Sequence, residues 1–172
     1  MSKRKKSLIF IVSLILVYLV GPRWPVPVLD NQVLKIADLS IDNVEHYVKK
    51  KETAIKNMKP NNEAEIVWAN DSAKTKTKYC FVYLPGFGAS KGEGEPLHRE
   101  IAQRYGMNLF LARLSKQGIV EQEPFLDLKE DKLVASAKEA ICIGKTLGEK
   151  VIIVCTSTGG TLGFYLAAND PN

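Results

Sequence analysis

Strand-like and helix-like segments alternate between residues 78 and 155, and this alternation constrains the fold more than any other feature of the sequence. Three short apolar stretches have the length and composition of strands. They are KYCFVYLP (78–85), NLFLA (108–112) and VIIVC (151–155). Apolar residues at helical spacing predict helices between them, over about 95–105 and 129–147. Strands joined by helices pair in parallel through right-handed crossovers, so we expect an α/β fold with VIIVC in the middle of a sheet covered on both faces.

Two further elements precede this unit. Residues 41–58 carry apolar side chains three, four or seven positions apart, which predicts an amphipathic helix. Its basic residues, 49–51, fit a solvated face better than a contact with anionic lipid headgroups, although both interpretations stay open. The segment EAEIVWAN (63–70) is predicted to be a strand that joins KYCFVYLP through a hairpin-like polar connection.

The N-terminal segment has the pattern of a targeting signal. The basic residues 1–6, MSKRKK, precede the apolar stretch SLIFIVSLILVYLVG (7–21). This pattern is typical of a signal anchor or a cleaved signal peptide, and the bulky, proline-containing sequence that follows favours an anchor in the membrane. Because the positive charges precede the segment, the rest of the chain would face away from the cytoplasm, in the periplasm or at the cell surface, or be secreted after cleavage. Prolines within residues 22–40 predict a stiff spacer.

Charge and cysteine content argue against several other classes of protein. The formal net charge is +5, and residues 3–6 supply four of the positive charges, so the rest is nearly neutral and gives little support to nucleic-acid binding. Three cysteines and two histidines occur without the spacing of a zinc site. Gly86 and Gly88 do not continue into a dinucleotide motif, and residues 144–146 lack the first glycine of a P-loop. We therefore expect no cofactor, no metal and no nucleic-acid partner.

Two glycine-containing turns follow strands of the predicted sheet. The sequence CTSTGG (155–160) comes directly after an apolar strand and leads into a helix. A serine held at a tight strand-to-helix turn adopts strained backbone angles and needs small residues two positions before and after it, which Cys155 and Gly159 supply. The second turn, in YLPGFGAS (83–90), exposes backbone N–H groups that suit an oxyanion. Taken alone, the CTSTGG stretch is equally typical of an ordinary helix cap.

Together these segments resemble the N-terminal part of the α/β-hydrolase family, close to its carboxylesterase and monoacylglycerol-lipase-like members. LPGFGAS resembles the family's oxyanion turn, ARLSKQGI (112–119) resembles its arginine loop, and CTSTGG resembles its nucleophile elbow. The resemblance extends from about residue 63 to 169. It implies a serine hydrolase that cleaves a small ester or acyl substrate through an acyl-enzyme, with Ser157 as nucleophile and the backbone N–H groups of Phe87 and Thr158 as oxyanion hole.

The sequence departs from the family pattern at three positions. Pro85 stands where the family usually has histidine, Gln117 replaces the histidine of the arginine loop, and Cys155 replaces the first glycine of the elbow. Cys155 is disfavoured as an alternative nucleophile because no base lies beside it in sequence. The family's strand order makes the strands of Cys80 and Cys155 neighbours about four residues out of register, which predicts no disulfide between them. Cys142 is expected to be a buried thiol on the inner face of its helix.

The resemblance also implies a triad in the order serine, acid, histidine, and this order exposes a gap. Residues 158–172 contain no histidine, and Asp170 lies too far along the elbow's own helix to act as the acid. His46 and His98 precede the serine, and His98 is expected at the surface. We therefore expect residues 41–172 to form a partial hydrolase domain that is inactive alone. The alternative is a non-catalytic, membrane-tethered remnant or a binding module.

Overall fold

The computed structural model describes residues 3–21, 23, 29 and 34–169. Its strands are β1 (Glu65–Val67), β2 (Thr77–Leu84), β3 (Asn108–Leu111) and β4 (Gly148–Cys155). Its helices are α1 (Lys3–Val20), α2 (Val44–Thr53), the short 3₁₀ helix η1 (Lys91–Gly94), α3 (Leu97–Arg104), α4 (Glu130–Leu147) and α5 (Thr158–Asn169). The strands and helices predicted between residues 78 and 155 are confirmed. The helix predicted over 41–58 is shorter, because the chain leaves it after Thr53 and pairs Met58 with Ile119 in an isolated antiparallel bridge.

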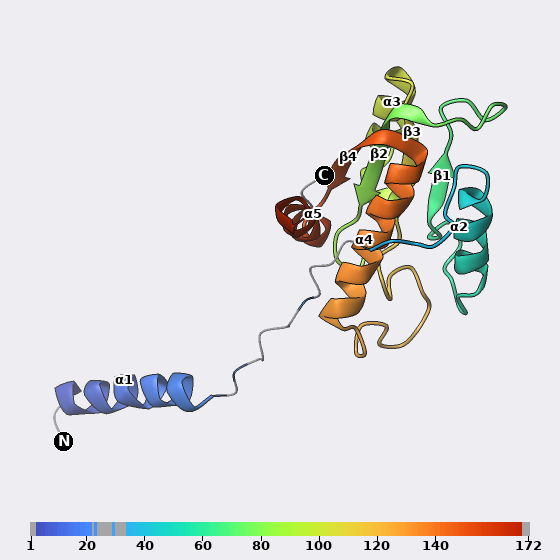
Figure 1. Cartoon of the computed structure of the whole chain (residues 1–172). Helices are drawn as coiled ribbons and strands as arrows, with labels where there is room; N and C mark the ends of the chain where they lie inside the picture. The colour runs from blue at the N-terminus through green and yellow to red at the C-terminus, as the bar shows by residue number, and fades with distance from the viewer. Residues whose placement is uncertain (1–2, 22, 24–28, 30–33, 170–172) are drawn as a thin grey trace.

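The strands form one mixed sheet in the order β1-β3-β2-β4 (Figure 1). Strand β2 pairs in parallel with β3 on one side and with β4 on the other, as helical crossovers require. Strand β1 runs antiparallel to β3. The chain therefore has an α/β fold whose parallel part is built from β3, β2 and β4.

The predicted hairpin between residues 63–70 and 78–85 is wrong, because β3 lies between β1 and β2. Asn108, at the start of β3 and only 1% exposed, accounts for the path of the connection. Its side-chain oxygen accepts a hydrogen bond from Ala69 N at 2.9 Å, and its amide donates to Thr75 O at 2.9 Å. Both ends of the β1–β2 loop are thereby held over the start of β3.

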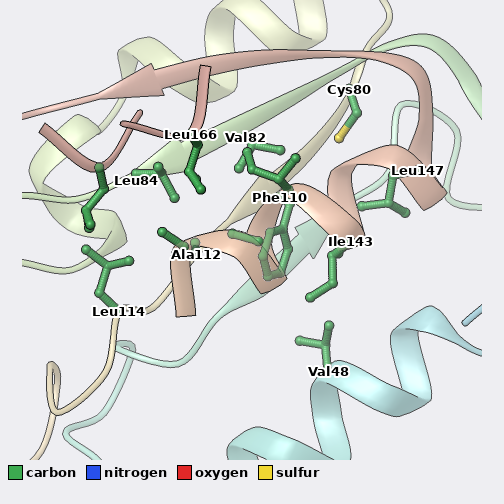
Figure 2. Close-up of a cluster of buried hydrophobic side chains, with 14 of the residues drawn as sticks. Val48, Cys80, Val82, Leu84, Phe110, Ala112, Leu114, Ile143, Leu147 and Leu166 are labelled. Atoms are coloured by element: carbon green, nitrogen blue, oxygen red, sulfur yellow. The ribbon is translucent and has the colours of Figure 1, made fainter. Parts of the chain in front are cut away.

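Two hydrophobic clusters cover the two faces of the sheet. The larger lies between the sheet, α4 and α2, and Figure 2 labels Val82 of β2, Phe110 of β3, Ile143 of α4 and Val48 of α2 within it. Gly144 lets α4 approach the sheet, since a Cβ there would lie 2.5 Å from a methyl group of Val82. The smaller cluster joins the opposite face to α3. Its buried members are Phe81, Tyr83, Ala102, Met107, Leu109 and Leu111.

Strand β4 does not occupy the middle of the sheet, so the central position predicted for VIIVC is wrong. Among the described residues β4 pairs only with β2. Its apolar residues are half-buried or exposed, and Ile152 is 38% exposed. An unbroken apolar strand signals burial on both faces but does not identify its neighbours, which depend on the rest of the sheet.

Helix α1 buries none of its residues and stands apart from the sheet in Figure 1. None of the helices in the described part of the chain is long and apolar enough to cross a membrane. The expected membrane span at 7–21 is therefore not supported: the helix begins with basic residues, and its apolar part, 7–20, extends only about 21 Å, against a hydrocarbon core of ~30 Å. The prolines of the predicted spacer, Pro22, Pro25 and Pro27, lie outside the described residues.

Candidate functional site

Ser157 lies in a strained turn between β4 and α5. Strand β4 ends at Cys155, α5 begins at Thr158, and Ser157 has a positive φ of 49°. Residues other than glycine seldom adopt this left-handed conformation. In the described part of the chain the others that do so lie in turns or loops, whereas Ser157 joins a strand directly to a helix. The others are Asp38, Asn57, Asn61, Lys74 and Lys116. The Ser157 side chain is exposed at the N-terminus of α5, where unpaired N–H groups and the helix dipole favour a negative charge.

Glycines bring α5 close to the neighbouring strand. A Cβ on Gly159 would lie 2.1 Å from Leu84 O and 2.7 Å from Pro85 O, so no side chain fits there. A Cβ on Gly163 would lie 3.2 Å from Cys155 Sγ, which shows how tightly the cysteine fills the space beneath the helix. The requirement for a small residue two positions after Ser157 is thus confirmed.

The second turn lies at the same edge of the sheet. Leu84, the last residue of β2, pairs with Cys155, and its carbonyl accepts a hydrogen bond from Thr156 N at 3.1 Å. The chain then turns, with Gly88 at a φ of 71° and the Ala89 N–H donating to Gly86 O at 3.2 Å. The strand ends therefore place the turn after β2 directly beside the turn after β4.

The two candidate oxyanion donors are available for a ligand. Within the described residues, neither the N–H of Phe87 nor that of Thr158 donates a hydrogen bond to another group. The Phe87 ring packs against Phe125, with ring centroids 4.5 Å apart, and is 57% exposed. The backbone of this turn thus offers a donor while its side chain points to a neighbouring loop.

Glu93 ties the two turns together, and sequence reasoning missed it. Its carboxylate accepts hydrogen bonds from Gly86 N at 2.8 Å and from the Tyr83 hydroxyl at 2.9 Å. The Tyr83 hydroxyl also lies 3.2 Å from Thr156 Oγ1. Burial, with the nearby Glu93 carboxylate adding to it, raises the pKa of Tyr83 to about 12, so the phenol stays protonated. A chain of hydrogen bonds therefore runs from η1 through β2 to the residue before Ser157.

An ion-pair cluster fixes the segment that carries Glu93. Lys91, at the start of η1, lies 2.7 Å from the Glu65 carboxylate of β1, which Arg99 of α3 also contacts at 2.9 Å. Burial alone would raise the pKa of Glu65, but hydrogen bonds from Arg99 and Lys91 outweigh it and hold that pKa below its usual value. Glu93 thus sits on a short helix that is anchored at the opposite edge of the sheet.

His98 is buried, so the expectation that it lies at the surface is wrong. It is 2% exposed, and its Nε2 lies 2.8 Å from Lys91 O. Its ring packs edge-on against Tyr83, with centroids 5.0 Å apart. The histidine therefore helps to hold η1, the segment that carries Glu93, and forms no hydrogen bond with Ser157 among the described residues.

The arginine loop contacts α2 rather than the elbow. The Arg113 guanidinium pairs with both carboxylate oxygens of Glu52, at 2.7 Å and 3.1 Å. Gln117 is fully buried, and its side-chain amide has no hydrogen-bond partner among the described residues. Gln117 is therefore part of the protein interior.

The cysteines behave as structural thiols. Cys80 pairs with Val151 in the β2–β4 register, so Cys155 lies four residues beyond it, as predicted. Burial raises the pKa of Cys155, which lowers its reactivity as a nucleophile. Cys142 is only half-buried, contrary to expectation, and its thiol donates a hydrogen bond to Leu34 O.

No protein-family model matches the sequence, and no curated protein matches it. Among the described residues no group of three or more histidine, cysteine, aspartate or glutamate side chains is placed to hold a metal ion.

Proposed function

We propose that this chain carries the nucleophile and the oxyanion hole of an α/β-hydrolase that cleaves carboxylic esters. Ser157 is the nucleophile, and the N–H groups of Phe87 and Thr158 receive the oxyanion. The observation that carries the proposal is the positive φ of Ser157, 49°, at a strand-to-helix turn where position 159 has room only for glycine. An ordinary helix cap has extended backbone angles and needs no such close approach.

The arrangement of strands supports the same proposal. The resemblance implies that the strands ending in the oxyanion turn and in the elbow are neighbours, and β2 and β4 pair in parallel. Ligands of open parallel sheets bind at the carboxyl ends of the strands, where both turns lie. Glu93 holds the oxyanion turn in the absence of the family's histidine at position 85.

In the proposed reaction, Ser157 Oγ attacks the ester carbonyl carbon while the carbonyl oxygen gains negative charge beside the two N–H donors. The bond to the alcohol then breaks, the alcohol leaves with the serine proton, and water releases the acid from the acyl-enzyme. This proton transfer needs a base, and neither described histidine is placed to supply one. His98 is bound to Lys91 O. His46 is exposed on α2, which lies beside β1 at the opposite edge of the sheet from β4 (Figure 1).

A fluorophosphonate probe, with imidazole added as an external base, tests this assignment. We expect slow phosphonylation of Ser157, located by peptide mass spectrometry, and ester turnover no higher than the residual ~10³–10⁴-fold over water that remains when triad members are missing. The Ser157→Ala variant should lose the label, and Ser72→Ala, at an exposed loop serine, should keep it. Equal labelling of Ser157→Ala would refute the nucleophile.

The oxyanion donor can be tested separately because Phe87 is the second residue of a four-residue turn, a position that suits proline. The Phe87→Pro variant removes the N–H and keeps the turn, whereas Phe87→Ala removes only the ring. We expect Phe87→Pro to slow labelling by about 10²-fold, the effect of losing one oxyanion donor, and Phe87→Ala to have little effect. Equal rates in both variants would favour the alternative of a binding module.

For residues 7–21 we propose a role in targeting, supported by the basic start of α1 and its apolar continuation. A cleaved signal peptide fits an apolar core of this length better than a span does. N-terminal sequencing of the exported protein distinguishes a cleaved signal from a retained one.

A further inference from the structure

A cleft that the proposed reaction does not use lies between α2, α4 and the loop after β3. Its volume is about 500 Å³, within the usual range of small-molecule sites. None of its lining residues belongs to β4 or α5, so it is separate from Ser157. The cleft therefore needs an explanation of its own.

The floor of the cleft is apolar. It is formed by Val48 of α2, Phe110 of β3 and Ile143 of α4, and Figure 2 shows these side chains pointing toward one another. Ile55 and Ile119 extend the apolar surface on the side of the loop. A hydrocarbon chain on this floor would lose its contact with water, which favours binding in proportion to the apolar area covered.

The rim of the cleft carries excess positive charge. Its cationic side chains are Lys51, Lys56, Arg113, Lys116 and Lys132, against the carboxylates Glu52, Glu121 and Glu139. Two of these carboxylates are closely paired within the protein.

The pairing of the rim leaves specific cations for a ligand. Glu52 is taken by Arg113, and Glu139 is contacted by both Lys51 and the Tyr47 hydroxyl. Lys116 lies 3.9 Å from Glu121 and Lys132 lies 3.9 Å from Asp131, and both contacts are loose. Lys56 forms no ion pair within the described part of the chain.

We propose that this cleft binds a single-chain carboxylate of the fatty-acid type. The alkyl chain lies on the apolar floor, and the carboxylate binds Lys56 and Lys116 at the rim. An apolar floor with a cationic rim matches both parts of such a ligand, since a short anion makes no contact with the floor and a neutral alcohol offers no charge to Lys56 and Lys116. The site does not depend on the chemistry proposed for Ser157.

Calorimetric titration of the full chain with decanoate, decanol and acetate, each below any micelle-forming concentration, tests the ligand class. We expect decanoate to bind at one site. Decanol should bind about tenfold more weakly, because it loses a charged hydrogen bond of about 1.5 kcal/mol. Acetate should show no binding. Absence of decanoate binding, or equal binding of decanol, would overturn the proposal.

Matched variants locate the site. Ala135 is exposed and lines the cleft, so Ala135→Trp should fill it and abolish decanoate binding, while Ala168→Trp on the exposed face of α5 should not. The double variant Lys56→Gln/Lys116→Gln should weaken decanoate about tenfold and leave decanol unchanged. The control Lys76→Gln/Lys150→Gln, at exposed lysines elsewhere, should bind as the wild type does.

The result is separable from the proposed esterase chemistry. The Ser157→Ala variant should bind decanoate with unchanged affinity, because no part of the cleft touches the elbow. Circular dichroism melts of each variant confirm that it is folded. Decanoate binding that survives Ala135→Trp in a folded protein would place the ligand elsewhere and refute the cleft.

Discussion

Strands β2 and β4 are neighbours of equal length and similar apolar character, yet they are buried to very different extents. Each has 8 residues, and they pair in parallel from Thr77 and Gly148 to Leu84 and Cys155. The last five residues of β2 are buried, whereas in β4 only Gly148 is. β2 has β3 on its other side, and β4 pairs with no second strand among the described residues. Place in the sheet, and not composition, sets the burial of each strand.

The candidate site combines one turn from each of these strands. The turn after β2 extends from the core and is held by Glu93, while the turn after β4 extends from an edge strand. Contact between the two depends on the close approach of α5 to the end of β2. The junction of the strands is therefore where the site is most vulnerable.

The largest effect is expected at this junction. The Gly159→Ala variant forces a Cβ to within 2.1 Å of Leu84 O and should cost about 3 kcal/mol of unfolding free energy, the upper part of the range for overpacking. The control is Gly160→Ala in the same helical turn, where the nearest atom to a Cβ is Cys155 Sγ at 4.0 Å. It should be neutral or stabilise by up to about 1 kcal/mol, through helix propensity. Urea unfolding compares the two, and similar losses would contradict the close packing of α5.

A smaller difference is expected between equivalent truncations within the strands. Val82 in β2 is fully buried, and Val154 in β4 is half-buried. The Val82→Ala change should cost about 2–3 kcal/mol, since it removes two buried methyl groups and leaves a cavity. The same change at Val154 should cost about 1 kcal/mol because part of its surface is already wet. Equal costs in urea unfolding would mean that β4 is covered as well as β2 is.

The sequence predicts the features of the fold that depend on local patterns. Helical and strand periodicity locate β2, β3, β4 and α4, because those patterns are local. Strand neighbours are not local, so the hairpin before β2 and the central place of VIIVC are wrong. The path of the β1–β2 loop depends on the buried Asn108, whose partners are 33 to 39 residues away.

The same limit applies to the candidate site. The strain at Ser157 and the need for Gly159 follow from a short motif and are confirmed by the backbone. The role of Glu93 could not be predicted, because a carboxylate in a glycine-rich segment does not indicate that it accepts a hydrogen bond from the Gly86 N–H. The burial of His98 was missed because its ring packs on Tyr83, a contact between two elements.

Alkaline pH should affect the two strands unequally. Burial raises the pKa of the Cys80 thiol to about 12 from its ordinary value of 9.0. The folded state then retains a proton that the unfolded state loses, so the contribution of this thiol to the unfolding free energy is constant below pH 9 and falls as the pH rises toward 12. The slope approaches about 1.4 kcal/mol per pH unit.

Urea unfolding at pH 8, 9 and 10 measures this contribution. The Cys80→Ala variant should show a shallower decline above pH 9 than the wild type. Cys155, on the edge strand, is less buried and its pKa is raised less strongly, so Cys155→Ala should decline nearly as the wild type does. If the unfolding free energy of Cys80→Ala declined with pH as steeply as that of the wild type, the Cys80 thiol would not be the source of the decline. Tyr83, with a pKa also raised to about 12, would then be the candidate.

The smallest effect on stability is expected at the exposed position of β4. Ile152 is 38% exposed, so Ile152→Lys should change the unfolding free energy by no more than about 0.5 kcal/mol. Its effect should instead appear in self-association, because an uncovered apolar edge strand pairs with other chains and a lysine there opposes this pairing. Light scattering should show less association than in the wild type. The control Leu126→Lys removes a side chain that is 78% exposed in a loop. Both variants retain the exposed apolar helix α1, so any association through α1 is the same in each. If the two substitutions lower association equally, exposed hydrophobicity in general is responsible. A decrease confined to Ile152→Lys identifies the edge of β4 as the surface through which the chains associate. Strand β2 has no such edge, because it is flanked on both sides.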